Sequence, residues 1–360
     1  MTKPLSTFLL IVMLFCAAAG QTHLRDRSSG RDQTASARGG SASEERPMSV
    51  DSITEVLWWL PEDTETVSVA RGPFKAPQIS EPSANISPSE YVEYALTASS
   101  LSLIHLIWDG SLYKSIVGST VKFCVEGSRR FREPKSLGSM LYEGCSITVL
   151  ESGMIPSRSA LVNQMTQGAN QVQTIAGQRV MMFEKKLEDD LWKIYVAVPE
   201  SNILLCATNQ DFLIQVLNRM QHRADKRALQ EDLPEWKQVN TGARFWAVRH
   251  YDRTAASRDP SSPVSGKQRA ANWPDTEAVG IVLDFDPDRS KVVTVRYLSG
   301  NKDALKLFSA QHTKIGQGFK PVISLRELGV VEMKVSCESE EEVGISLLVL
   351  FSLLGHGVYV

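Results

Sequence analysis

The sequence predicts an α+β fold with a mostly antiparallel sheet, helices packed on one face, and an internal duplication of β-β-α units. Three observations lead to this prediction. Short apolar runs alternate with polar turns, as in antiparallel strands. Capped amphipathic segments precede and follow these runs. The order of a Leu-Pro-Glu turn, a strand, a hairpin and a strand-to-helix junction occurs twice.

The N-terminal residues 1–20 have the three-part order of a secretory signal peptide. Lys3 precedes an apolar run from Phe8 to Phe15, and small residues follow at 17–20. The protein is therefore expected to be exported to a periplasmic or extracellular location. Two alternatives stay open, which are acylation of Cys16 and an uncleaved segment that tethers the protein to the membrane.

Residues 21–48 are rich in Ser, Gly, Arg and Gln and contain almost no apolar side chains. Such a segment cannot bury enough surface to offset its ordering entropy, so we expect a disordered linker. The formal net charge of -2, with acids and bases interspersed over most of the chain, argues against a nucleic-acid partner. Order is expected from residue 49, with a first α+β half at 49–238 and a second at 239–360.

The first helix is expected to begin after Ser52, because Glu55 follows three residues later in a capping-box arrangement. Pro61 ends it. We expect the adjacent Trp58 and Trp59 to pack this helix against the sheet. The helix also has one apolar face, formed by Ile53, Val56, Leu57 and Leu60.

The remainder of the first half is expected to be mostly strands. Helices are predicted near 87–97 and 101–117, and Thr208 with Asp211 is expected to cap a further amphipathic helix. A strand precedes the first of these at Val67 and Val69. The other predicted strands cover 121–127, 145–151, 178–186, 190–200 and 202–208.

The second half repeats this order. Leu233-Pro234-Glu235 matches Leu60-Pro61-Glu62 and precedes a strand at 244–251. A hairpin is expected from 280–286 and 291–299. The segment 301–305 then matches 209–213 in three of five places, again at a strand-to-helix junction.

The chain also resembles a group of uncharacterised exported bacterial proteins with two related α+β halves. The resemblance depends on the signal peptide, the L-P-x-D-T turn at 60–64, the segment ATNQDFLIQVL at 207–217 and PEW at 234–236. It covers about residues 50 to 360 and implies the fold. It implies no activity and no site residues.

Cysteine and acidic spacings give little evidence for bridges or metals. An exported compartment permits a disulfide between Cys124 and Cys145, which lie on two strand-like runs, although both can equally be small buried hydrophobes. No close Cys or His pair indicates a metal site. The alternating Asp residues at 284–288 lack the glycine and glutamate of a calcium loop, and nucleotide-binding fingerprints are absent, so no cofactor is expected.

The best catalytic candidates are His250 and Asp252, which alternate at the end of a strand that leads into a long polar loop. Ser257, Ser261 and Ser262 in that loop are candidate nucleophiles. The sequence favours a non-enzymatic binding or scaffold module at the cell envelope, with an unknown envelope protein or ligand as partner. A hydrolase that uses the His250 and Asp252 region is the alternative.

The C-terminal segment is expected to form a buried helix. Ser339 with Glu342 gives its cap, and the apolar run from Ile345 to Leu354 has no polar side. That run is short for the roughly 20 residues that span a bilayer, so no transmembrane segment is expected in the mature chain. Burial between layers or in a homodimer interface would cover it.

Overall fold

The computed structural model describes residues 52–75, 120–130, 142–151, 158–187, 190–222, 224–250, 278–286, 291–299, 321–326, 329–339 and 342–343. The chain divides into a unit Met1–Ser49 and a unit Val50–Val360, and all these residues belong to the second. The signal peptide, the linker, the helices expected near 87–97, 101–117 and 345–354, and the 301–305 match lie outside the described residues.

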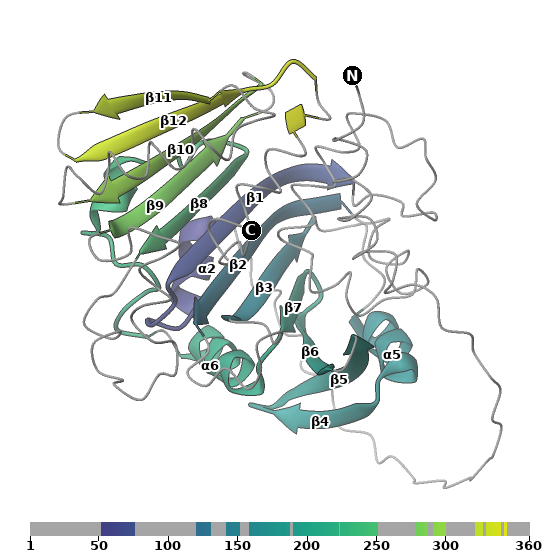
Figure 1. Ribbon diagram of the computed structural model, residues 1–360. Coiled ribbons are helices and arrows are strands. Elements are labelled where there is room, and N and C mark those ends of the chain that lie inside the picture. Colours follow the sequence, from purple (N-terminus) through teal and green to yellow (C-terminus); the bar gives the residue numbers. More distant parts are fainter. Residues whose placement is uncertain are drawn as a thin grey trace, which may run out of the picture. The chain divides into compact units, whose positions relative to one another are not determined.

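The described strands form one mostly antiparallel 12-stranded sheet (Figure 1). Every ladder between neighbouring strands is antiparallel, as predicted. The strands are β1 (Thr66–Lys75), β2 (Thr120–Arg130), β3 (Tyr142–Leu150), β4 (Gln171–Ile175), β5 (Gln178–Leu187), β6 (Asp190–Glu200), β7 (Ile203–Ala207), β8 (Phe245–His250), β9 (Ala278–Phe285), β10 (Val292–Ser299), β11 (Pro321–Arg326) and β12 (Val330–Ser336).

The strand order is arranged about the pair β8 and β1 at the centre. Outward from β8 the sheet runs β9, β10, β12 and β11, and outward from β1 it runs β2, β3, β7 and β6. On each side the chain order is reversed for one pair of strands. β12 lies between β10 and β11, and β7 lies between β3 and β6. Only the side of β1 continues further, with β5 and β4.

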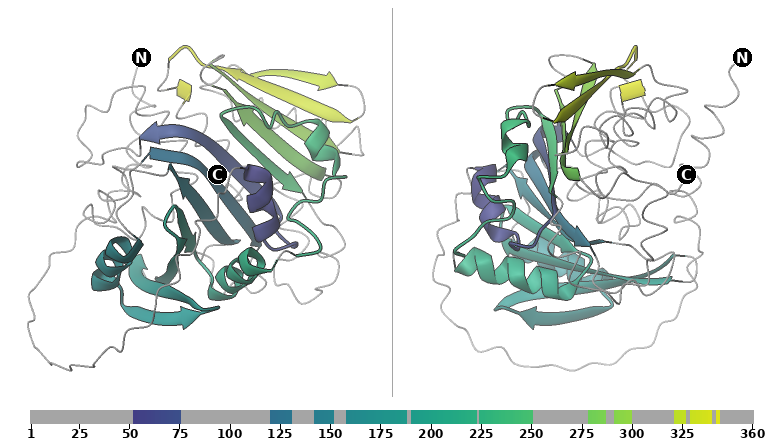
Figure 2. Two further views of the ribbon diagram at one scale, coloured as in Figure 1. Left: turned by 180° about the vertical axis from the view of Figure 1, so that it is seen from behind. Right: turned by 60° about the vertical axis from the view of Figure 1, so that its left-hand side comes forward.

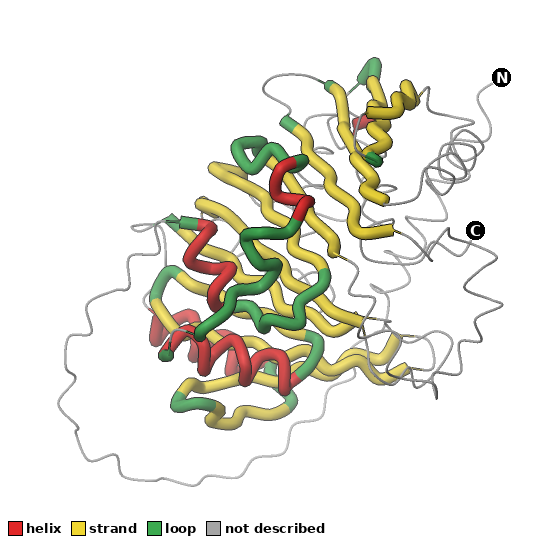
Figure 3. Tube along the Cα trace, turned by 90° about the vertical axis from the view of Figure 1, so that its left-hand side faces the viewer, coloured by secondary structure: helices red, strands yellow, loops and turns green. Residues whose placement is uncertain are grey.

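The helices α2 (Ile53–Trp59) and α6 (Gln210–Gln221) and the short 3₁₀ helix η1 (Pro234–Lys237) cover one face of the sheet (Figures 2 and 3). α2 packs on β2 and α6, α6 packs on β3, β6 and β7, and η1 packs on β8 and β9. A further helix, α5 (Arg158–Gly168), contacts β5 and β6. No helix in the described part of the chain is long and apolar enough to cross a membrane.

Local sequence signals explain the helix boundaries. The Glu55 N–H donates to Ser52 Oγ at 3.3 Å at the start of α2, as predicted. Trp59 and the predicted apolar face of this helix are buried, whereas Trp58 is half-buried. The N-cap of α6 is Asn209, one residue later than predicted, because the Thr208 hydroxyl instead accepts a hydrogen bond from the Gly144 N–H at 3.1 Å.

The predicted cap near the C-terminus is present. The Glu342 N–H donates to Ser339 Oγ at 3.2 Å, and Glu342 Oε2 accepts from the Glu338 N–H at 2.7 Å. These are the two bonds of a capping box, with the second shifted by one residue. Val343, the last described residue, is buried.

Candidate functional site

Only one of the two candidate catalytic residues, His250, lies in the described part of the chain. His250 is the last residue of β8. Its backbone N–H donates to the carbonyl of Glu65, the residue before β1, at 2.8 Å. Asp252 and the three candidate serines lie outside the described residues. The imidazole of His250 keeps 26% of its side-chain surface exposed.

A buried carboxylate positions this imidazole. Nδ1 of His250 lies 2.8 Å from Oε1 of Glu235, and the Glu235 side chain is fully buried. Glu235 belongs to η1, the second Leu-Pro-Glu turn. Its Oε2 accepts no hydrogen bond from the part of the chain that the structure describes. Glu235 could not be identified from the sequence, because its contact with His250 forms only when η1 packs on β8.

Gly280 of β9 makes room for the Glu235 side chain. A Cβ atom at this position would overlap Oε1 of Glu235 and would lie 2.6 Å from the Arg249 carbonyl oxygen. The first Leu-Pro-Glu segment has a similar contact, since a Cβ on Gly127 of β2 would lie 2.6 Å from Cδ2 of Leu60. A glycine thus lets each Leu-Pro-Glu segment approach the sheet.

The pair can do one of two things. If Nδ1 carries the proton and donates it to Glu235, Nε2 of the neutral ring is unprotonated and can act as a general base. The same contact also satisfies a buried carboxylate and fastens η1 to the sheet, which is a structural role. A base also needs a nucleophile within hydrogen-bond reach, and the candidate serines at 257, 261 and 262 lie outside the described residues.

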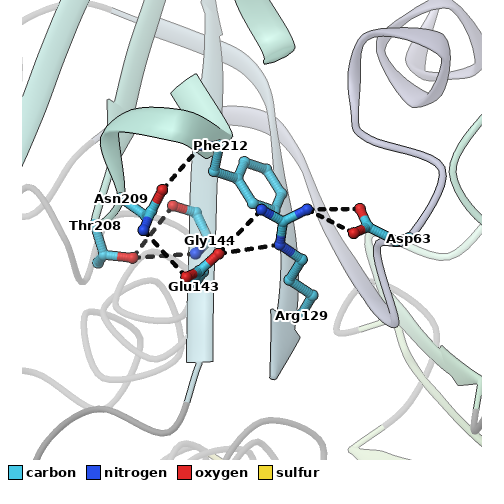
Figure 4. A network of polar contacts seen from close by, with 7 residues as sticks. All are labelled: Asp63, Arg129, Glu143, Gly144, Thr208, Asn209 and Phe212. Atoms are coloured by element: carbon cyan, nitrogen blue, oxygen red, sulfur yellow. Dashed lines mark hydrogen bonds and ion pairs between the residues drawn. The ribbon is translucent and has the colours of Figure 1, made fainter. Parts of the chain in front are cut away.

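Two arginine clusters hold the helices and turns to the sheet. In the first (Figure 4), Nη1 of Arg129 donates to both carboxylate oxygens of Asp63, at 2.8 and 2.6 Å. Nε of Arg129 donates to Oε2 of Glu143 at 3.0 Å. Burial alone would lower the pKa of Arg129, but hydrogen bonds and charge from Asp63 and Glu143 outweigh it and raise the pKa.

The same cluster reaches the start of α6. Glu143 accepts a hydrogen bond from Asn209 Nδ2 at 3.1 Å, and Asn209 Oδ1 caps α6 through the Phe212 N–H at 3.0 Å (Figure 4). The Phe212 ring lies 5.1 Å below Cζ of Arg129. One arginine therefore connects the turn before β1, the strands β2 and β3, and the N-terminus of α6.

Arg296 of β10 forms the second cluster. Its Nε donates to Oε2 of Glu332 at 2.9 Å, and its Nη1 donates to Asp284 and, at 2.8 Å, to the Gln238 carbonyl beyond η1. Asp284, the first of the alternating Asp residues at 284–288, is thus an ion-pair partner of Arg296. No group of acidic, His and Cys side chains in the described part of the chain could hold a metal ion.

The face of the sheet away from α2 and α6 presents small polar side chains. Cys124 and Glu126 lie on this face, because Gly127 and Arg129 lie on the helix-bearing one. Cys145 pairs with Gly127, so it lies on the face opposite to Cys124. Both thiols are buried and neither is part of a disulfide, so the bridge considered from the sequence is not formed in this structure.

Glu126 is the one acidic residue in this polar row among the described residues. Ser68 and Ser146 face it from β1 and β3, and Cys206 of β7 lies beyond Ser146. No described cation forms an ion pair with it. Burial raises the pKa of Glu126 from 4.5 to about 8.

This shift predicts that stability falls as the pH rises through the window from 4.5 to about 8. The folded state keeps a proton there that the unfolded state releases, and one full proton would give about 1.4 kcal/mol per pH unit. We expect a smaller slope, because Glu126 keeps part of its surface accessible. Glu126→Gln should remove this slope in urea titrations, whereas the exposed Glu62→Gln should keep it; equal slopes in all three proteins would contradict the assignment.

Comparisons with known proteins give no further assignment. No protein-family model, no curated protein and no solved structure matches this chain.

Proposed function

We propose that this chain is an exported, non-enzymatic binding or scaffold module of the cell envelope. The supporting observation is how its charged groups are used. Arg129 and Arg296 each engage two carboxylates and connect separate elements, and Glu235 is buried under η1. Charged side chains that make such internal contacts stabilise the fold and are not available to bind a substrate. The signal-like residues 1–20 support export.

We also propose that the sheet arose by duplication of one unit. The strand orders on the two sides of the β8 and β1 pair support this, as do the Leu-Pro-Glu segments that precede both central strands. Gly127 and Gly280 support it further, since both belong to the strand next to the centre. In this arrangement β10 corresponds to β3 and β12 to β7, so the 301–305 segment after β10 corresponds to the α5 region and not to α6.

Export gives the first test. The mature chain is expected to begin near Gln21, because the small residues that precede it form a signal-peptidase site. N-terminal sequencing of the protein recovered from the source organism checks this. Recovery of Met1 on the exported protein would contradict cleavage and favour the tethered alternative.

Binding gives the second test. The tagged protein, cross-linked in its native envelope, is expected to recover the same partners as its His250→Gln variant, because the proposed role does not use the imidazole. An unrelated exported protein with the same tag is the control. If neither protein enriches a partner or ligand above that control, the binding role is wrong.

The second candidate is a hydrolase, and His250 is the observation that favours it. Its imidazole, 26% exposed, is held by the buried Glu235, which is how a general base is oriented. Asp252 and the loop serines remain the proposed additional groups. The loss of activity on removing the titratable nitrogen of His250 distinguishes this candidate from a scaffold.

A further inference from the structure

Glu235 is the buried charged residue of η1, and one described side chain contacts its carboxylate. Oε1 lies 2.8 Å from Nδ1 of His250, and no part of the Glu235 side chain is exposed. Oε2 accepts no hydrogen bond from the described residues. A buried carboxylate is costly unless a cation or several donors compensate it, so the charge of Glu235 depends on what His250 supplies.

The other charged side chains on and next to η1 are engaged elsewhere. They form ion pairs with one another, are exposed, or donate to a backbone carbonyl. They are Arg227 with Glu231, Arg296 with Asp284, the exposed Lys237, and Arg244, which donates to the Pro73 carbonyl. Glu65, the residue before β1, accepts the His250 N–H at its carbonyl and adds a second acidic residue beside His250. Negative charge around an imidazole favours its protonated form.

We propose that His250 and Glu235 form an imidazolium–carboxylate pair at neutral pH, and that loss of the imidazolium proton releases η1 from β8 and β9. The pair is electrically neutral while both ring nitrogens carry protons. When the ring loses one proton, a carboxylate without a cation is left buried under η1. The inference concerns the attachment of η1 and does not depend on the proposed function.

The direction of the pH dependence follows from the two states. With η1 released, the imidazole is in water and loses its proton near pH 6.5, as an ordinary histidine does. With η1 attached, the pair keeps this proton to a higher pH. The attachment is therefore strongest below about pH 6.5 and weakens above it, by up to about tenfold in the opening constant per pH unit.

Release of η1 would uncover an aromatic surface. The Trp236 ring of η1 lies 5.7 Å from the ring of Trp246 of β8, at an interplanar angle of 76°. Trp246 is buried in the closed arrangement. The pH of the surroundings would thus control how much of Trp246 is accessible.

Nitrogen NMR of the full chain with labelled histidine reads the protonation of the ring directly. We expect both ring nitrogens of His250 to carry protons at about pH 7.5, where an ordinary histidine is about 90% neutral. Glu235→Gln removes the negative charge and should return the ring to its neutral form. A neutral His250 in the original chain, or an imidazolium that persists in Glu235→Gln, would overturn the proposal.

Amide hydrogen exchange measures the release of η1. The N–H groups of Gln238 and Val239 donate to the Glu235 carbonyl at 2.9 and 3.1 Å. A helix of four residues does not persist without its packing, so both amides lose protection when η1 leaves the sheet. Their exchange rates, divided by the intrinsic rate at each pH, give the opening constant.

Three variants separate this effect from other titrations. All measurements use the Glu126→Gln background, which removes the contribution expected of Glu126. The opening constant should rise above about pH 6.5 in this background and equally in His222→Gln, which changes an exposed histidine at the end of α6. His250→Gln should abolish the rise. An opening constant that does not change with pH in the background protein, or the same rise in His250→Gln, would overturn the proposal.

Discussion

Arg129→Ala is expected to lower the free energy of unfolding by about 3–5 kcal/mol, since removal of one partner of a buried ion pair leaves an uncompensated charge. Glu143 keeps only 12% of its side chain exposed and would lose its arginine, and Phe212 would lose the guanidinium above its ring. The Asn209 cap that Glu143 holds would loosen too. Urea unfolding followed by circular dichroism measures the effect.

A surface ion pair provides the control for this prediction. Lys193 and Glu184 lie 3.6 Å apart across β5 and β6, and Lys193 is 49% exposed. Lys193→Ala should change stability by no more than about 1 kcal/mol. If Arg129→Ala costs no more than this control, the cluster does not fasten the turn before β1 and the helix α6 to the sheet.

Gly280→Ala is expected to lower the free energy of unfolding by about 3 kcal/mol. The added Cβ would overlap the Glu235 carboxylate and would meet the Arg249 carbonyl at 2.6 Å, and a backbone atom in a central ladder cannot move aside easily. The main relief is displacement of η1, which would break the contact between Glu235 and His250. Thermal and urea unfolding measure the loss of stability.

Gly168, the last residue of α5, is the matched glycine control. A Cβ there would be 3.8 Å from the nearest atom, in the Phe183 ring, which is an ordinary contact. Gly168→Ala should be neutral or slightly stabilising, because alanine favours a helix. A Gly280→Ala variant as stable as Gly168→Ala would show that Glu235 does not occupy the place beside β9.

Elements with strong local signals could be predicted from the sequence. The caps at Ser52 and Ser339 each need only a hydroxyl and a glutamate three residues later, so a short window contains them. The predicted strands of the β5 to β7 region and the β9 to β10 hairpin have continuous apolar runs. The predicted N-cap of α6 was wrong by one residue, because Thr208 and Asn209 are both good capping residues. Which of them caps the helix depends on the distant Gly144, whose N–H donates to Thr208.

Other elements have weaker signals or depend on distant contacts. α5 has few apolar residues, with Val162 and Met165 buried, so its period is faint. The strands β4, β11 and β12 were not predicted, since β4 and β11 contain polar residues typical of edges. Strand order also could not be predicted, because nothing local indicates that β1 pairs with β8 across about 180 residues of chain.

The candidate site was predicted in part. His250 was identified from its place at a strand end, and the structure adds Glu235, which precedes it by 15 residues. A Leu-Pro-Glu turn gives no local reason to expect a buried carboxylate. Only the packing of η1 on β8 and β9, with Gly280 beneath it, brings the two side chains together.

We propose that His250 fastens η1 to the sheet and takes no part in catalysis, and the variant His250→Gln tests this most directly. Glutamine keeps an N–H donor for Glu235 but has no titratable nitrogen. The measurement is complementation in the source organism, normalised to the abundance of the protein. We expect the variant to retain activity. A loss of about 100-fold or more at normal abundance would contradict it and identify His250 as a base.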